Sequence, residues 1–159
     1  MTTPLNKKSV RSLLILYNEL MNELRRRKVI RSTNNPVGDY TEHLVKKKLD
    51  LSISGGSTAG FDAKDNKGRR YQIKGRRVTK ENRSTELSAI RNLKKKPFDF
   101  LIAVVYKQDF SVDYVAKLTC SAVKKHAGYS KHVNAWRLQM RRSLLNTPGV
   151  IDITKKFKA

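Results

Sequence analysis

The sequence predicts a single α/β domain, a sandwich of helices around a mixed sheet of at least four strands. Three observations support this class. Segments with helical spacing of apolar residues alternate with short β-like runs, residues 66 to 68 carry a hairpin signal, and Phe98–Tyr106 is almost continuously apolar, as in a strand covered on both faces. With 159 residues, the chain is long enough to bury one core and too short for two independent ones.

The N-terminal part of the chain predicts two helices. The first spans about Lys8–Lys28, and the second has Asn35 as N-cap, Pro36 at its first position and an end near Leu49. The basic run Arg25–Lys28 fits either compensation of the helix dipole or a phosphate contact. Apolar residues recur at helical spacing in the first helix: Leu13, Leu16, Tyr17, Leu20, Met21 and Leu24.

A β-hairpin follows. The strands Ala59–Asp65 and Arg69–Arg76 flank the loop Asn66-Lys67-Gly68, whose glycine supplies the left-handed position of a three-residue turn. In this register Asp65 faces Arg69.

The same register brings polar groups together. Asp62 lies opposite Gln72, and because alternate residues of a strand share a face, Lys74 lies beside them. Tyr71 and Ile73 face the other way, toward the core. Three functional groups therefore converge on one patch.

The remaining elements come from the same kinds of signal. They are a Ser- and Gly-rich connector at Ser52–Ser57, a third helix from Ser84 or Thr85 to Leu93, a strand at Ser111–Leu118, a short helix ending at Gly128, a helix at Ser130–Asn146 and an apolar tail at Val150–Ile153.

Charge indicates the class of partner. The chain has 35 Lys and Arg against 13 Asp and Glu, a net charge of +22, and nucleic acid is the commonest surface that neutralises such an excess. An anionic membrane is the weaker alternative, and no apolar run long enough to span a bilayer occurs. We expect a soluble, cytoplasmic protein without a signal peptide. Cys120 is the single cysteine, so no internal disulfide or cysteine-rich zinc site is expected.

Four residues suggest metal-dependent chemistry. Glu42 lies at the edge of the apolar stripe of the second helix, behind Asp62, Gln72 and Lys74. Two carboxylates and a carboxamide oxygen are hard ligands suited to Mg²⁺ or Mn²⁺. The lysine beside them should stay charged in the field of the acids and act as an electrostatic clamp on water or phosphate.

This order of elements resembles the PD-(D/E)xK, or restriction-endonuclease-like, nuclease superfamily over Pro36–Tyr106. The resemblance implies that Glu42 is the accessory helix acid, Asp62 the principal metal ligand, Gln72 the variable ligand and Lys74 the lysine that orients the attacking water. Phe61 replaces the proline of the motif, and Gln72 replaces its second acid, as in methyl-directed restriction nucleases.

The resemblance implies an α/β/α sandwich and a Mg²⁺- or Mn²⁺-dependent endonuclease. Residues 1–35 would form an N-terminal helical extension, 36–106 the nuclease core, and 107–159 a C-terminal strand and helices. We expect double-stranded DNA as the partner and consider a homodimer, since a duplex cut needs two active sites, with Leu13–Leu24 as one candidate contact. The basic residues expected to contact nucleic acid are Arg76, Arg77, Lys80, Arg83, Arg137 and Arg141.

Other interpretations remain open. A nuclease fold without catalysis would bind DNA or RNA only, and a small basic protein of a nucleoprotein particle would also carry this charge, although the chain has no Gly-rich basic tail. A purely structural interpretation makes Asp62 a turn-proximal acid, Gln72 and Lys74 a polar strand face, and Glu42 the ion-pair partner of Lys46 one helical turn away.

Overall fold

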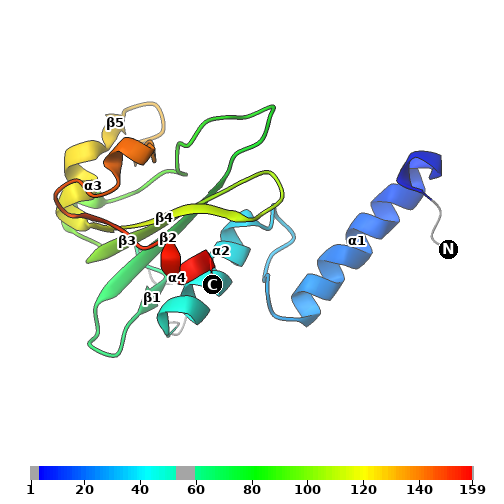
Figure 1. Cartoon of the computed structure of the whole chain (residues 1–159), viewed down its shortest axis with the longest axis horizontal. Helices are drawn as coiled ribbons and strands as arrows, with labels where there is room; N and C mark the ends of the chain where they lie inside the picture. Colours follow the sequence, from blue (N-terminus) through cyan, green and yellow to red (C-terminus); the bar gives the residue numbers. More distant parts are fainter. Residues whose placement is uncertain (1–3, 53–59, 159) are drawn as a thin grey trace.

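The computed structural model describes residues 4–52 and 60–158 and contains a mixed five-stranded sheet (Figure 1). Its strand order is β1-β2-β3-β4-β7, with β2 and β3 parallel and the other neighbours antiparallel. The predicted α/β class and mixed sheet are therefore confirmed. The strands are β1 (Ala63–Lys64), β2 (Arg70–Arg77), β3 (Phe100–Tyr106), β4 (Val112–Thr119) and β7 (Val150–Asp152).

Helices cover one face of the sheet, and mainly irregular chain covers the other. On the first face, α2 (Val37–Leu49) and α4 (Lys155–Lys158) pack Val45 and Phe157 against strand residues such as Ile73. On the second face, α3 (Cys120–His126) joins extended segments around residues 87 and 138. Shorter elements complete the fold: η1 (Leu5–Lys7), η2 (Leu93–Lys95), η3 (Arg142–Leu144) and the separate hairpin of β5 (Gly128–Ser130) and β6 (Ala135–Arg137).

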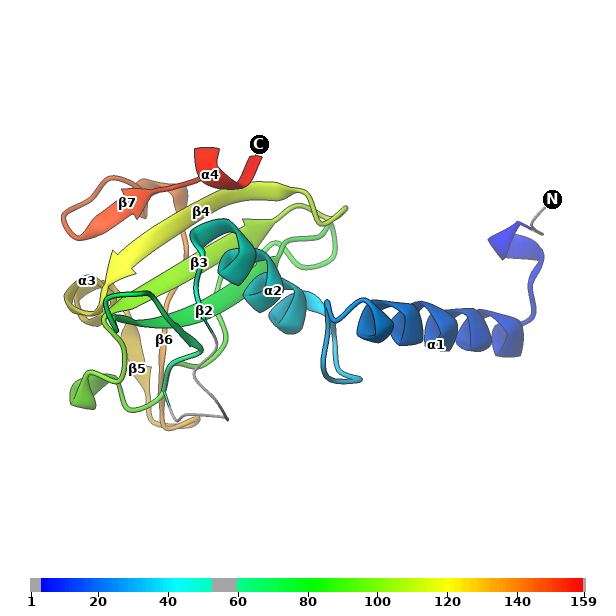
Figure 2. The same ribbon diagram turned by 90° about the horizontal axis from the view of Figure 1, so that it is seen from below.

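The N-terminal helix extends away from the sandwich. Figure 1 and Figure 2 show α1 (Val10–Arg26) projecting beyond the sheet layers, with only its C-terminal end near the body. Its N-cap is Ser9, whose hydroxyl accepts from the Ser12 amide at 3.1 Å. The helix was predicted, but half of its apolar stripe is in solvent: Leu13 is 37% exposed, Tyr17 53% and Leu20 58%, whereas Met21 is buried.

The predicted hairpin turn is confirmed. Asp65 and Arg69 pair through a backbone hydrogen bond of 3.1 Å, and Gly68 has a φ of +76°. The β1–β2 ladder includes Ala63 but not the preceding residue, Asp62, whose amide still donates to the Tyr71 carbonyl at 2.8 Å. The predicted first strand is therefore shorter than expected, since residues 60–62 are not part of β1, and Ala59 and residues 53–57 of the connector lie outside the described residues.

Two predicted helices are wrong. The segment from Ser84 to Leu93 is mostly extended, as is much of the segment Ser130–Asn146, and they bind each other through backbone pairs such as Ile90–Trp136. Leu87, Ile90 and Leu93 have helical spacing but are buried individually by tertiary contacts. The C-terminal part is therefore a strand, a helix, a hairpin, a strand and a short helix. Tertiary packing overrides a short-range helical pattern here.

A close approach between α2 and β2 fixes how the helix lies on the sheet. A Cβ built on Gly75 would be 2.0 Å from the Thr41 Oγ1 atom and 3.0 Å from its Cβ. Thr41 is fully buried, donates to the Val37 carbonyl at 2.6 Å and accepts from the Tyr106 hydroxyl at 3.0 Å. Only glycine leaves room for this contact, which positions Glu42, the next residue of the helix.

None of the described helices is both long enough and apolar enough to cross a membrane.

Candidate active site

Asp62 lies where β1 stops short and one edge of β2 opens. Among the described residues, β1 pairs with only the first two residues of β2. The Asp62 carboxylate takes the place of a strand partner there, because its Oδ2 accepts from the Ile73 amide at 2.7 Å. Burial raises the pKa of Asp62, with Glu42 adding to the increase, while the Ile73 amide, Lys74 and Lys46 oppose it.

Gln72 presents a buried oxygen with no partner. Tyr71 and Ile73 point into the core beneath α2, so the period of two places Gln72 and Lys74 on the opposite face of β2. The Oε1 atom of Gln72 is inaccessible to solvent and accepts no hydrogen bond from residues 4–52 or 60–158. A carbonyl oxygen left unpaired in this way costs about 1–3 kcal/mol unless a ligand fills the vacancy.

Lys74 is partly buried beside Asp62. Its Nζ donates to the Ala89 carbonyl at 3.1 Å, a contact from the long connection between β2 and β3. Burial lowers the pKa of Lys74, Arg91 lowers it further, and Asp62 and Glu42 oppose the change. The sequence predicted that the acids would keep Lys74 charged. Desolvation has the larger effect on its pKa, and it reduces the free-energy difference between the charged and the neutral amine.

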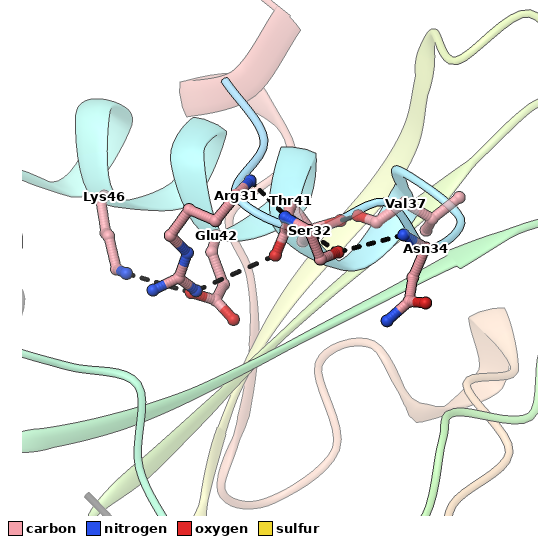
Figure 3. A network of polar contacts seen from close by, with 8 residues as sticks. Arg31, Ser32, Asn34, Val37, Thr41, Glu42 and Lys46 are labelled. Atoms are coloured by element: carbon pink, nitrogen blue, oxygen red, sulfur yellow. Dashed lines mark hydrogen bonds and ion pairs between the residues drawn. The ribbon is translucent and has the colours of Figure 1, made fainter. Parts of the chain in front are cut away.

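Glu42 is engaged by two cations from its own part of the chain. Its Oε2 accepts from the Arg31 guanidinium at 2.6 Å and from the Lys46 Nζ at 3.1 Å (Figure 3). The Lys46 contact is the ion pair that the structural interpretation of the sequence predicted. Arg31 is held nearby because its amide donates to the Asp39 carboxylate at 2.8 Å.

We call Glu42, Asp62, Gln72 and Lys74 the Asp62 cluster, because Asp62 interacts electrostatically with both Glu42 and Lys74, and Gln72 lies two residues from Lys74 on the same strand face. Within residues 4–52 and 60–158, no group of three His, Cys, Asp or Glu side chains is arranged to hold a metal ion.

Two of the six residues predicted to contact nucleic acid also hold loops of the fold. Arg76 Nε donates to the Ser84 carbonyl at 2.8 Å, and Arg77 Nε donates to the Gln108 carbonyl at 2.8 Å. The guanidinium of Arg77 also lies 4.4 Å from the ring centroid of Phe110. These arginines hold loops around the end of β2.

The other four predicted contacts divide into two places. Arg137 on β6 forms an ion pair of 3.2 Å with Glu86. Lys80, Arg83 and Arg141 line a cleft of about 560 Å³ near the ends of β2 and β3.

The sequence analysis missed three cations that the structure places at these sites. Lys107 and Arg142 line the same cleft, which we call the basic cleft after its five cations, Lys80, Arg83, Lys107, Arg141 and Arg142. Arg31 reaches Glu42 from the turn before α2. Lys107 could have been found, because it directly follows the apolar strand, and the ends of parallel strands are where ligand crevices form. No sequence signal indicated Arg31 or Arg142.

No protein-family model matches the chain, and no curated protein matches it significantly.

The pKa shifts predict opposite effects for two neighbouring carboxylates. The raised pKa of Asp62 means that its charge opposes folding at neutral pH, so Asp62→Asn should stabilise the protein at pH 7, and this gain should vanish near pH 3. Asp65 is the matched control: desolvation opposes the shift, but hydrogen bonds from Arg69 and Lys67 lower its pKa to about 2. Asp65→Asn should therefore destabilise at pH 7, with the loss fading as pH falls toward 2. Urea unfolding at several pH values measures both, and a loss of stability in Asp62→Asn at pH 7 would contradict the burial effect.

Proposed function

We propose that the protein is a Mg²⁺- or Mn²⁺-dependent nuclease of restriction-endonuclease-like fold that hydrolyses phosphodiester bonds of DNA. The observation that carries this proposal is the buried, unpaired Oε1 of Gln72 beside Asp62 and Lys74. A structural role for Gln72 gives no reason to bury an unsatisfied carbonyl on a strand face. A ligand role does give a reason, because a divalent cation would be the partner of this carbonyl oxygen.

Each member of the cluster has a defined task in this proposal. Oxygens of Asp62, Gln72 and Glu42 would hold the cation, which when bound supplies Lewis-acid activation of the phosphate and of a water. Asp62 is already oriented by the Ile73 amide. The Lys74 ammonium would donate a hydrogen bond to the attacking water or to a phosphate oxygen, and its lowered pKa makes the neutral amine, which could accept a proton from that water, easier to form than in an exposed lysine.

The arrangement of elements supports the fold part of the proposal. A helix carrying the acid precedes a hairpin with Asp62, Gln72 and Lys74, and β3 then lies parallel to β2. One feature departs from the expected pattern, since residues 78 to 99 connect β2 and β3 without an α-helix.

A second candidate function is nucleic-acid binding without catalysis. The observation that favours it is the double engagement of Glu42 by Arg31 and Lys46, which satisfies that carboxylate without a metal. The replacement of the second acid of the motif by Gln72 points the same way. The two functions differ in the effect of substitutions on cleavage.

Catalysis by the cluster predicts a separation of cleavage from binding. Asp62→Ala and Lys74→Ala should each lower the rate of DNA cleavage by at least about 100-fold, because each removes a group that acts on the reacting phosphate. Their affinity for DNA in EDTA should stay within a few-fold, since the basic surface provides most of the binding. Lys67→Ala, which removes one exposed charge from the hairpin loop, serves as the control and should cleave normally. Normal cleavage by both cluster variants would refute the assignment.

The ligand role of Gln72 predicts opposite results for two substitutions. Gln72→Glu keeps an oxygen in place and adds a negative charge, so half-maximal cleavage should require less Mg²⁺ than in the wild type. Gln72→Leu removes the oxygen and should require more. Titration of cleavage with Mg²⁺ and Mn²⁺ measures the difference. Equal loss in both variants, without rescue by Mn²⁺, would favour the binding protein.

We also propose that a second copy of the chain covers the exposed face of α1. The heptad spacing of Val10, Leu13, Tyr17, Leu20 and Leu24 is that of a two-helix seam. Residues 12 to 24 contain Glu19 and Glu23 but no Lys or Arg, so this face escapes the repulsion that the net charge of +22 imposes elsewhere. Two copies also provide the two active sites that a duplex cut requires.

If α1 forms the dimer contact, substitutions in its seam should halve the mass of the protein in solution. Wild-type protein should elute with twice the chain mass of 18.2 kDa in size-exclusion chromatography with light scattering. Leu13→Glu combined with Leu20→Glu should give the monomer, because charges in the seam prevent the helices from packing. Arg11→Glu combined with Ser12→Glu, on the same helix outside the heptad seam, is the control and should remain dimeric. A wild-type monomer at all concentrations would exclude the contact.

A further inference from the structure

The basic cleft combines cations without ion pairs and an apolar floor. Among the described contacts, no ion pair involves Lys80, Arg83, Lys107 or Arg141, although Lys107 interacts electrostatically with the nearby Asp109. Asp113, the one acid of the lining, pairs with Arg142 at 2.6 Å. Unneutralised cations gathered in one concavity raise the local concentration of a polyanion.

The floor of the cleft adds a second kind of contact. Val78 is a partly exposed apolar residue of the lining, and the buried Val105 and Tyr114 lie beneath the cations. The guanidinium of Arg142 lies 4.6 Å from the ring centroid of Tyr114 and is fixed by Asp113, which makes a rigid planar surface. Phosphate recognition alone needs no apolar floor. Planar guanidinium groups and apolar walls are instead what unstacked bases bind.

We propose that the basic cleft binds one unpaired nucleotide of a nucleic-acid strand, with its base against the floor and its flanking phosphates on the four free cations. The volume of about 560 Å³ lies within the range of small-ligand sites, and base pairing in a duplex would hide the edge and faces of that base. This inference deepens the proposed function because it names the form of the substrate, a strand with a single-stranded segment near the scissile phosphate.

The position of the cleft fits a strand that also reaches the Asp62 cluster. Lys74 and Val78 are four residues apart along β2 and its continuation, about 13 Å at the rise of an extended chain. That distance corresponds to about four nucleotide steps of a stacked strand. The Lys74 ammonium and the cleft are linked by the segment from Thr79 to Ala89, which contacts both.

The test compares strands of equal charge with and without bases, in EDTA so that cleavage plays no part. Wild-type protein should bind a fluorescent octamer of deoxyuridine about tenfold more tightly than an abasic octamer of the same length, measured by anisotropy. Thr85→Leu narrows the cleft without changing charge or adding an aromatic ring on which a base could stack, and it should reduce this ratio to about one, leaving the affinity for the abasic strand unchanged. Gln108→Leu provides a second filling variant from an exposed loop.

The salt dependence of strand affinity tests whether the cations of the cleft bind phosphates. Lys107→Ala combined with Arg141→Ala should lower the slope of log affinity against log salt by about 1.4, as for two lost phosphates of a single strand. Lys124→Ala combined with Lys125→Ala removes the same charge from α3 and should leave the base preference intact. A uridine RNA octamer that shows the same loss on filling the cleft assigns the site to base and phosphate rather than to the sugar.

Two results would overturn the inference: equal binding of abasic and base-containing strands by wild type, or a base preference that both filling variants retain. Neither result depends on catalysis. Loss of cleavage in the Asp62 cluster variants with an intact base preference would support the cleft, and a cleaving protein without base preference would refute the cleft alone.

Discussion

The contact between Thr41 and Gly75 determines how the rest of the candidate site is arranged. It lets α2 lie directly on β2, and a side chain at position 75 would push the two elements apart. Overpacking of a close contact costs about 1–3 kcal/mol or shifts the backbone. A shift of α2 would move Glu42 away from Asp62, whose ionisation it affects. The buried hydroxyl of Thr41 also accepts a hydrogen bond from Tyr106, so one residue of α2 contacts the neighbouring strands β2 and β3.

The sequence predicted the elements whose signals are local. The turn at Gly68 needs a left-handed residue, and β3 is apolar throughout because both of its faces are covered, so each could be recognised without tertiary information. The segments around Ile90 and Trp136 could not. Their apolar residues are spaced as in a helix, but each segment supplies the backbone partner of the other across 46 residues of sequence, a relation that periodicity does not encode.

The candidate site was predictable to the same extent. Asp62, Gln72 and Lys74 belong to one hairpin, so strand alternation alone placed Gln72 and Lys74 on one face. Of the two ion pairs of Glu42, only one could be predicted. Lys46 is one helical turn away in the sequence, whereas Arg31 lies before α2 and contacts Glu42 only through the fold of the intervening turn. The division of the basic residues could not be read from composition. Arg76 and Arg77 donate hydrogen bonds to loop carbonyls. Lys107 and Arg142 are distant in sequence and come to line the same cleft only in the folded chain.

Arg31 and Lys46 occupy one carboxylate oxygen of Glu42, so they are internal competitors of any cation that uses this residue as a ligand. A polyanion that draws these two side chains toward its phosphates frees the carboxylate. In the proposed nuclease, the factor by which nucleic acid tightens cation binding would then equal, by reciprocity, the factor by which the cation tightens nucleic-acid binding. Substrate and metal would bind that nuclease as a coupled pair, because both act on the same ion pairs of Glu42.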